Sequence, residues 1–201
     1  WGRNTDGQLG NNTTTASNSP VAVSGLTNVI ALSAGAYHNC ALTNTGTVSC
    51  WGNNANGRLG IGSTTSTKVP VDLGLSNIVA INASITHSCA LSNVGVVSCW
   101  GGNGNGKLGD GTTTQSTTPV TVTSLTASAL TTGRGRNHTC ALTSTGSINC
   151  WGNNDFGQLG DGSTTQSLTP VAVSGVTDAT ISAGGYHNCA VTSSDTVSCW
   201  G

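Results

Sequence analysis

Residues 38–60 read HNCALTNTGTVSCWGNNANGRLG, and versions of this stretch recur along the whole chain. The stretch contains the dipeptide Trp-Gly, which recurs along the chain at intervals of 49 to 51 residues, at Trp1, Trp51, Trp100, Trp151 and Trp200. The phrases that begin at the first four are WGRNTDGQLG, WGNNANGRLG, WGGNGNGKLG and WGNNDFGQLG. Self-similarity at a fixed period of this length is the signature of a repeat architecture, in which each unit buries its apolar faces against its neighbours.

Each unit contains short runs of alternating apolar and polar residues separated by turn residues. In the first unit we expect strands near 20–24, 29–34, 38–43 and 47–51, because these runs are rich in Val, Ile, Leu and Thr. No segment has an apolar period of 3.6 residues that is long enough for a helix. Four short strands in about 50 residues are typical of one blade of a β-propeller.

The sequence therefore predicts an all-β protein, a β-propeller of four-stranded blades in a single repeat domain over residues 1–201. The blades are expected at approximately 1–50, 51–99, 100–150 and 151–199, with 200–201 opening a further unit. The chain contains no Met, so we expect a processed product or a part of something longer.

Every unit places two cysteines ten positions apart around a short turn. A three-residue loop with Gly46 in the left-handed conformation puts Ala41 opposite Ser49 and Cys40 opposite Cys50. In the fourth unit Asp takes the place of this Gly, and Asp tolerates the same conformation better than most residues. Opposed residues are close enough for strand twist to bring their sulfur atoms together. We therefore predict four cross-strand disulfides: Cys40–Cys50, Cys89–Cys99, Cys140–Cys150 and Cys189–Cys199.

Composition limits the kinds of partner that this chain binds. Only 6% of the residues are charged, against about 25% in a typical domain, and the formal net charge is -1. Nucleic-acid binding requires a concentration of basic residues that is absent here, so we expect no nucleic-acid partner. No stretch approaches the roughly 20 apolar residues of a membrane span, so we expect no membrane insertion.

The repeated histidines, His38, His87, His138 and His187, are open to a metal-binding or acid–base interpretation. Each unit offers His-x-Cys and a second Cys, as in His38, Cys40 and Cys50. These are three possible zinc ligands, and the unit has no fourth to complete a tetrahedral site. No Asp or Glu recurs beside the histidines to orient a base. We therefore expect structural hydrogen bonds from the histidines and no catalytic, metal or cofactor site. The repeated tryptophans are expected to be packing residues: Trp1, Trp51, Trp100, Trp151 and Trp200.

The stretch GAYHNCALTNTGTVSCWGNNANGRLG at residues 35–60 resembles the repeat of the regulator of chromosome condensation family. The resemblance covers the chain four times over and implies a β-propeller, usually of seven blades. Four blades are therefore expected to be part of a larger ring or of an assembly. The family includes nuclear nucleotide-exchange factors, light receptors and secreted enzyme inhibitors, so function must be argued from sites. The paired cysteines, the low charge and Ser84 in place of the unit Gly depart from the family pattern.

The loops offer two weaker candidates for sites. Asp110-Gly111 and Asp161-Gly162 follow the Leu-Gly of two units, and we expect turns there because calcium needs more carboxylates. Four asparagines satisfy the N-glycosylation pattern, which a chain rich in Asn and Thr contains by chance: Asn11, Asn12, Asn82 and Asn137.

The leading hypothesis is a non-catalytic, secreted or surface-displayed β-propeller that acts as a structural or protein-interaction module. Paired cysteines favour an extracellular or cell-surface location. The expected partners are other copies of the chain or further blades of a longer one. The alternative is a ligand-binding module for a glycan or an enzyme to be inhibited, weakened by the scarcity of aromatic residues. A nucleotide-exchange or chromatin-binding factor is a third hypothesis, disfavoured by the low charge.

Overall fold

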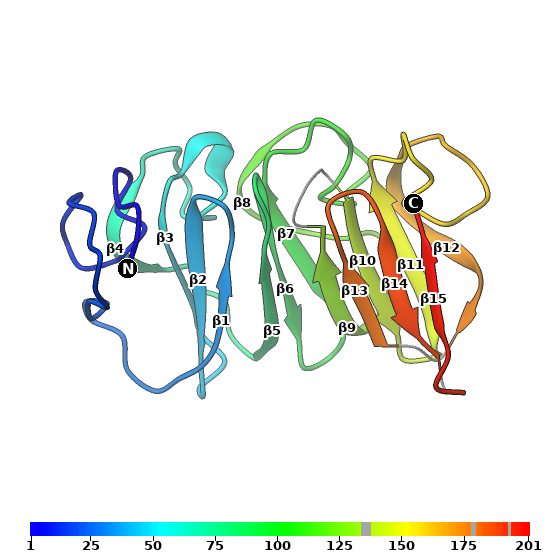
Figure 1. Ribbon diagram of the computed structural model, residues 1–201, viewed down its shortest axis with the longest axis horizontal. Coiled ribbons are helices and arrows are strands. Elements are labelled where there is room, and N and C mark those ends of the chain that lie inside the picture. The colour runs from blue at the N-terminus through cyan, green and yellow to red at the C-terminus, as the bar shows by residue number, and fades with distance from the viewer. Residues whose placement is uncertain (134–137, 178–179, 193) are drawn as a thin grey trace.

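The chain folds into four antiparallel sheets that stand side by side in chain order (Figure 1). This computed structural model describes residues 1–133, 138–177, 180–192 and 194–201. The first sheet contains β1 (Val29–Ala34), β2 (His38–Thr43), β3 (Val48–Gly52) and β4 (Thr67–Asp72). The second contains β5 (Ile78–Ala83), β6 (His87–Ser92), β7 (Val97–Gly101) and β8 (Ser116–Thr121). The third contains β9 (Ala127–Thr132), β10 (His138–Thr143), β11 (Ser147–Gly152) and β12 (Ser167–Thr177). The fourth contains β13 (Thr180–Ala183), β14 (Asn188–Val191) and β15 (Val197–Trp200).

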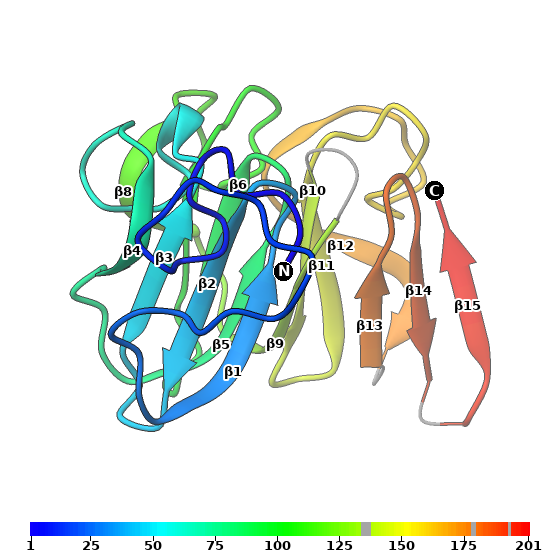
Figure 2. The ribbon, with the colours of Figure 1, turned by 60° about the vertical axis from the view of Figure 1, so that its left-hand side comes forward.

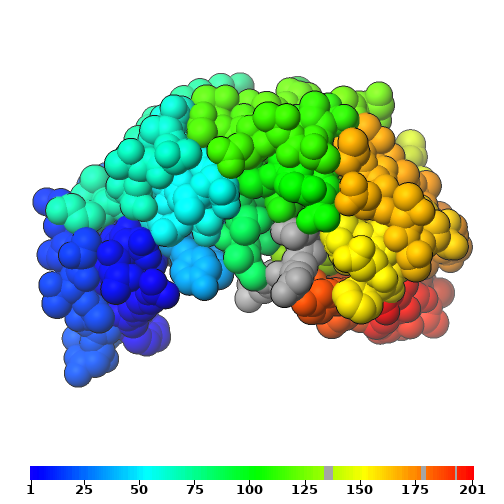
Figure 3. Space-filling view, turned by 90° about the horizontal axis from the view of Figure 1, so that it is seen from above, coloured from blue at the N-terminus to red at the C-terminus, as the bar shows by residue number. Residues whose placement is uncertain are grey.

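The sheets follow a curve whose two ends lie apart (Figure 3). The first strands of successive sheets contact one another, β1 with β5, β5 with β9, and β9 with β13. The sheets therefore pack face to face as the blades of a four-blade β-propeller arrangement, which confirms the predicted fold class. A single 3-10 turn, η1 (Ala55–Gly57), is the one helical element in the described part of the chain, and no helix there is long and apolar enough to cross a membrane.

Each four-stranded sheet takes its outer strand from the sequence unit that follows. β4 lies beyond Trp51 yet pairs with β3, so the first sheet spans residues 29–72 and not 1–50. The strand expected at 20–24 is wrong, since residues 18–28 contain no strand. Its counterparts β4, β8 and β12 are strands because a third strand lies beside each of them, whereas residues 1–28 make only an isolated bridge between Gly2 and Ser17. At the other end of the chain, β15 is the free edge of the last described sheet (Figure 2).

The hairpin register matches the prediction. β2 and β3 pair with Ala41 opposite Ser49 and Cys40 opposite Cys50. The left-handed residue of the turn is Gly46 in the first sheet and Asp195 in the fourth, with φ of 77° and 60°. The structure contains the four disulfides at the predicted positions, each with 4.1 Å between its Cα atoms.

The apolar core is divided among the three junctions between sheets. The first junction contains the Cys40–Cys50 disulfide from one sheet and Trp100 from the next, with Leu59 from the loop that follows β3. The second junction contains Cys89–Cys99, Trp151 and Leu108 in the same roles. The third contains Cys140–Cys150, Leu159 and the half-buried Trp200. Each of the first three disulfides therefore lies between sheets, in the part of the fold that holds the sheets together.

The burial pattern predicts an order of reduction for the four disulfides. The six cysteines of the first three bridges are at most 1% exposed, whereas Cys199 is exposed and Cys189 is half-buried. Thiol–disulfide exchange requires access of the attacking thiolate to a sulfur atom. We expect mild reductant under native conditions to open Cys189–Cys199 first, as measured by alkylation and peptide mass spectrometry. After denaturation all four should open at similar rates; early native labelling of Cys89 or Cys140 would contradict the burial argument.

Candidate interaction site

A buried asparagine organises the loop that follows Trp-Gly in every repeat. The Asn54 Oδ1 atom accepts a hydrogen bond from the Leu59 amide at 2.9 Å, and its Nδ2 donates to the carbonyls of Ser63 and Thr65 at 2.9 and 3.0 Å. The same three bonds are made by Asn4, Asn103 and Asn154. This role was not predicted, although Asn stands fourth in each of the four phrases.

The loop ends on a glycine that allows close approach of a tryptophan ring. Gly60 has φ of +76°, and a Cβ atom there would lie 2.8 Å from the Trp100 ring. Gly109 has the same relation to Trp151, with 2.7 Å to the indole nitrogen. Any side chain at these positions would push the indole out of the junction, so the Leu-Gly pair sets the distance between loop and sheet.

Each tryptophan from Trp51 onward bonds to the backbone carbonyl just before this Leu-Gly pair. The indole N–H of Trp100 donates to the Arg58 carbonyl at 3.0 Å. The equivalent bonds run from Trp51 to Gln8, from Trp151 to Lys107 and from Trp200 to Gln158, at 2.9 to 3.1 Å. Trp1 differs, since it is 75% exposed. Four of the five tryptophans thus connect a sheet to a loop.

The same carbonyl accepts a second bond that continues to a histidine of the preceding sheet. Ser88 donates its hydroxyl to the Arg58 carbonyl at 3.0 Å, so its oxygen accepts from His38 Nε2 at 2.7 Å. The pairs His87–Thr139 and His138–Asn188 repeat the contact at 2.9 and 3.0 Å. Thr139 and Asn188 likewise donate to the carbonyls of Lys107 and Gln158. The Nε2 atom of each of these three histidines therefore carries a proton, and each ring reaches across a junction.

Burial favours the neutral form of two of these rings, those of His38 and His87. Desolvation, with a smaller contribution from the charge of Arg58, lowers the pKa of His38 to about 3. The pKa of His87 also lies well below its usual value, because of desolvation first and then the charge of Lys107. The Nδ1 atoms of both rings are buried without a hydrogen-bond partner among the described residues. His187, by contrast, is exposed on the last sheet.

The loops after the third strands gather at one end of the blades, at the top of Figure 1. Tyr37 lies there between two guanidinium groups, with Arg3 at 5.5 Å and Arg58 at 5.9 Å from its ring centroid. These residues border a hollow of about 380 Å³ together with Asp6, whose pKa is lowered chiefly by a hydrogen bond from Asn53. This end of the propeller therefore presents polar groups in fixed positions.

The two loop candidates from the sequence have structural explanations. The Asp110 carboxylate accepts from the backbone amide of Thr112, and Asp161 does the same with Ser163, both at 3.0 Å, as expected for turns. The described residues contain no group of three His, Cys, Asp or Glu side chains placed to hold a metal ion.

Among the four asparagines of the glycosylation pattern, Asn12 is exposed and Asn11 is half-buried. Asn82 donates its amide to the Leu130 carbonyl across a junction, and Asn137 lies outside the described residues.

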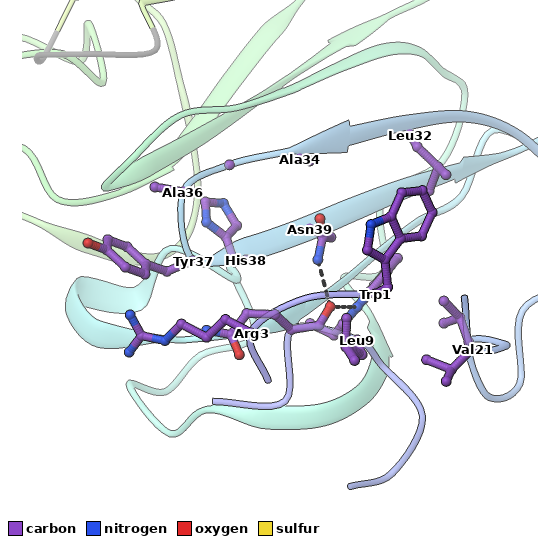
Figure 4. Close-up of a pocket in the computed structure, with 14 residues that line it drawn as sticks. Trp1, Arg3, Leu9, Val21, Leu32, Ala34, Ala36, Tyr37, His38 and Asn39 are labelled. Carbon is purple, nitrogen blue, oxygen red and sulfur yellow. Dashed lines mark hydrogen bonds between the residues drawn. The ribbon is translucent and has the colours of Figure 1, made fainter. Parts of the chain in front are cut away.

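A second and larger hollow lies at the leading end of the arc (Figure 4). It has a volume of about 410 Å³ and lies between the N-terminal segment and the first sheet. Its apolar wall includes Leu9, Val21, Val23, Leu32 and Trp51. These apolar side chains make the cavity a candidate contact surface for a partner.

The histidine contacts predict a loss of stability in acid. The pKa of His38 is lower in the folded state than in the unfolded state, so acid protonates the unfolded chain first and favours unfolding. The contribution of the neutral ring to the free energy of unfolding is therefore complete above about pH 6.5 and is lost as the pH falls toward 3. We expect His38 to lower the free energy of unfolding by about 1 kcal/mol per pH unit as the pH falls through this window, as measured by denaturant titration. His38→Gln keeps a donor at the same reach and should flatten the slope relative to the parent protein. Equal slopes in the two proteins would contradict the assignment.

The loop asparagine predicts a large effect of a small substitution. Asn54→Asp keeps the acceptor for Leu59 but removes the donors for the Ser63 and Thr65 carbonyls. We expect a loss of about 2 kcal/mol or more in the free energy of unfolding, because the fully buried Asn54 amide is replaced by a carboxylate that faces two carbonyl oxygens. The control is N44D, the same change at an exposed turn residue, which should be within about 0.5 kcal/mol of the parent protein. Urea unfolding measures both, and equal stability of N54D and N44D would contradict the role of Asn54.

Comparison with solved structures shows that the fold is shared with other proteins. Human WBSCR16 matches with a TM-score of 0.86 and 24% identity, over 100% of this chain and 55% of that one. Prp20p from Saccharomyces cerevisiae matches with a TM-score of 0.81 and 22% identity, over 100% of this chain and 50% of that one. The ectodomain of the Physcomitrella patens receptor kinase CR4 matches with a TM-score of 0.58 and 22% identity, over 94% and 41%. The chain thus spans about half the length of these proteins, whose similarity at such identities concerns the fold.

Sequence comparison identifies the repeat itself. A search of curated protein sequences returned no significant match. The model of the Regulator of chromosome condensation (RCC1) repeat matches residues 1–42, 45–91 and 95–142. A second model of the same repeat matches residues 29–58, 135–158 and 179–201. With its repeated Trp-loop-His junctions and these matches over most of its length, the chain belongs to the RCC1 repeat family.

Proposed function

We propose that this chain is a non-catalytic, disulfide-stabilised protein-interaction module that works outside the cell or at the cell surface. The observation that carries the proposal is that all eight cysteines form disulfides, three of them buried at sheet junctions. Disulfides persist in oxidising compartments and are rare in the cytosol and nucleus. Four disulfides, three of them inside the apolar core, therefore support an oxidising environment.

Two features support a protein as the partner. RCC1-type propellers are interaction modules, and the solved structure of Prp20p was described with its binding properties to Gsp1p and histones. This chain has six basic residues, of which Arg58 and Lys107 are at most 5% exposed. That distribution disfavours the phosphate backbone of a nucleic acid as the ligand. The polar loop end and the apolar leading end remain as contact surfaces.

The absence of catalysis is part of the proposal. Two of the histidines have lowered pKa values in buried junctions, so they are not placed to exchange protons with a substrate. The hollow at the loop end holds cations, an aromatic ring and a carboxylate, but no nucleophile beside a base among the described residues. These features suit recognition better than chemistry.

Glycan or inhibitor binding is a second candidate, favoured by one contact. Phe156 and Tyr186 form an exposed edge-to-face pair with 5.1 Å between ring centroids. Exposed aromatic side chains are common anchors for ligands and protein partners. A nucleotide-exchange role has less support, because an intracellular compartment would leave the eight cysteines reduced.

The first test is the redox state of the cysteines in protein isolated from its own source with thiols trapped by alkylation. The proposal predicts that no cysteine is labelled when the protein is denatured in the alkylating reagent without reductant, and that all eight are labelled when it is denatured after reduction. Denaturation makes the buried cysteines accessible in both samples. Labelling of both cysteines of a buried pair in the unreduced sample would overturn the proposed location and favour the intracellular alternative.

A further inference from the structure

The two ends of the arc expose the two halves of the junction that the chain builds three times internally. At the first internal junction, one sheet contributes the side chains of Cys40, Leu42, Val48 and Cys50. The receiving side is formed by Leu59, Ile81 and Trp100, with Leu73 packed against them. Each half buries apolar surface that neither half could bury alone.

The cavity at the leading end has the receiving half of this junction. Repeat alignment makes its wall residues Leu9, Val23, Leu32 and Trp51 the counterparts of Leu59, Leu73, Ile81 and Trp100. Leu32 is 67% exposed, whereas its counterpart Ile81 is 8% exposed. The cavity of about 410 Å³ is therefore the space that a preceding sheet would fill.

The trailing end has the inserting half. The counterparts of Leu42 and Val48 on the last sheet are Val191 and Val197, which are 46% and 66% exposed instead of 0%. The Cys189–Cys199 disulfide is uncovered on the same sheet, whereas Cys40–Cys50 is buried. This face has the side chains that fill the space at each internal junction.

The N-terminal segment already lies in the position that an internal loop takes. The Asn12 amide donates to the Lys68 carbonyl at 3.0 Å, as Gly62 does to Thr117 and Gly111 to Leu168 at 2.8 and 3.0 Å. The Ser24 amide donates to the Gly10 carbonyl at 2.9 Å, as Thr123 does to Gly109 at 3.0 Å. Residues 17–23 are thus held like an outer strand, but without a sheet.

The internal registers define where such a strand would pair. In each four-stranded sheet the third strand pairs its cysteine with a valine of the outer strand: Cys50 with Val71, Cys99 with Val120 and Cys150 with Val171. By the same spacing, Cys199 on the free edge of β15 falls opposite Val21. The Gly52–Thr67 pair likewise corresponds to Gly201 and Ser17.

We propose that the trailing sheet of one copy docks into the leading cavity of a second copy, whose residues 17–23 become the fourth strand beside β15. Val191, Val197 and the Cys189–Cys199 disulfide fill the cavity. His187 donates to the Oδ1 atom of Asn39 of the second copy, as His138 does to Asn188. Asn39 is prepared for this role, since its Nδ2 donates to the Gln8 carbonyl at 2.8 Å just as Asn188 donates to Gln158.

A second copy is favoured as the occupant because the chain itself carries both halves of the junction and because one copy matches only part of the larger folds. The chain covers 55% of human WBSCR16 and 50% of Prp20p, so one copy corresponds to about half the length of each. Two copies joined head to tail have two equivalent junctions and can close. The inference rests on the proposed function as an interaction module and specifies its partner.

Docking requires the exchange of one pair of backbone hydrogen bonds, the pair between Gly2 and Ser17. In the isolated chain, Ser17 pairs with Gly2 through two backbone hydrogen bonds of 2.6 and 3.1 Å. Docking transfers these bonds from Gly2 to Gly201 of the other copy, and the exposed Trp1 moves out of the way. The number of backbone hydrogen bonds at Ser17 is conserved in this exchange.

Sedimentation velocity over a wide range of concentrations, without reductant, tests the proposal. We expect a concentration-dependent dimer that Val197→Asp and Leu32→Asp each weaken by roughly tenfold or more, because each buries an unpaired carboxylate. Both positions are exposed in the single chain, so the variants should fold. The matched control is Val94→Asp, the same change at a 73% exposed residue in the turn between β6 and β7, which should leave association unchanged.

Mixing the two interface variants adds a stricter test. V197D damages the trailing face and L32D damages the leading face, so a dimer of either variant alone has no undamaged junction. A mixed dimer retains one undamaged junction, between the trailing face of L32D and the leading face of V197D. We expect dimers in the mixture only. Reduction of Cys189–Cys199 should also slow as the concentration of the parent protein rises, and this protection should be absent in L32D, whose disulfide surroundings are unaltered.

A chain that stays monomeric at all concentrations, with its four disulfides intact, would overturn the docking proposal and would assign the two faces to further repeats of a longer chain. Association that V94D weakens and the two interface variants do not would also overturn it. Either result leaves the proposed function standing, because that proposal fails only on free thiols in the native protein.

Discussion

One backbone carbonyl per repeat, the one just before Leu-Gly, determines how the sheets of this protein meet. It accepts the indole N–H of a tryptophan and a second donor from Ser88, Thr139 or an Asn, and that second group accepts from a histidine of the preceding sheet. The carbonyl can have this role because a buried Asn holds its loop in place. A sheet of four short strands exposes two apolar faces, so the fold depends on repeating this junction.

The disulfides and the buried histidines both belong to these junctions between sheets. The chain has few charges with which to build ion-pair networks, and each disulfide closes a short loop that adds about 2–3 kcal/mol at most. Placing the sulfur atoms at the junctions fills the apolar space between sheets as well as cross-linking two strands. The histidines must then remain neutral in a desolvated site, which couples the stability of the propeller to the redox state and to the pH of its surroundings.

Much of this architecture could be read from local patterns. The hairpin register followed from the ten-residue spacing of Cys40 and Cys50 around Gly46, because a turn and its flanking strands are local. The role of Asn54 was missed, although Asn recurs at its position, since its partners lie in a Thr-rich stretch with no pattern of its own. The pairing of β4 with β3 was also missed, because a loop of variable composition separates them.

The sequence by itself determined the repeat, through the regular return of Trp-Gly, and the cysteine hairpins with their disulfide pairs, which depend on residues within about a dozen positions of one another. Only the tertiary structure decided which unit supplies the outer strand of each sheet, which tautomer each histidine adopts, and which surfaces remain open. These features depend on contacts between residues 30 to 50 positions apart, as in Trp100 with Arg58 and His38 with Ser88. Equivalent residues, such as Val48 and Val197, therefore have the same local sequence and opposite environments, because burial is a property of what packs against a sheet.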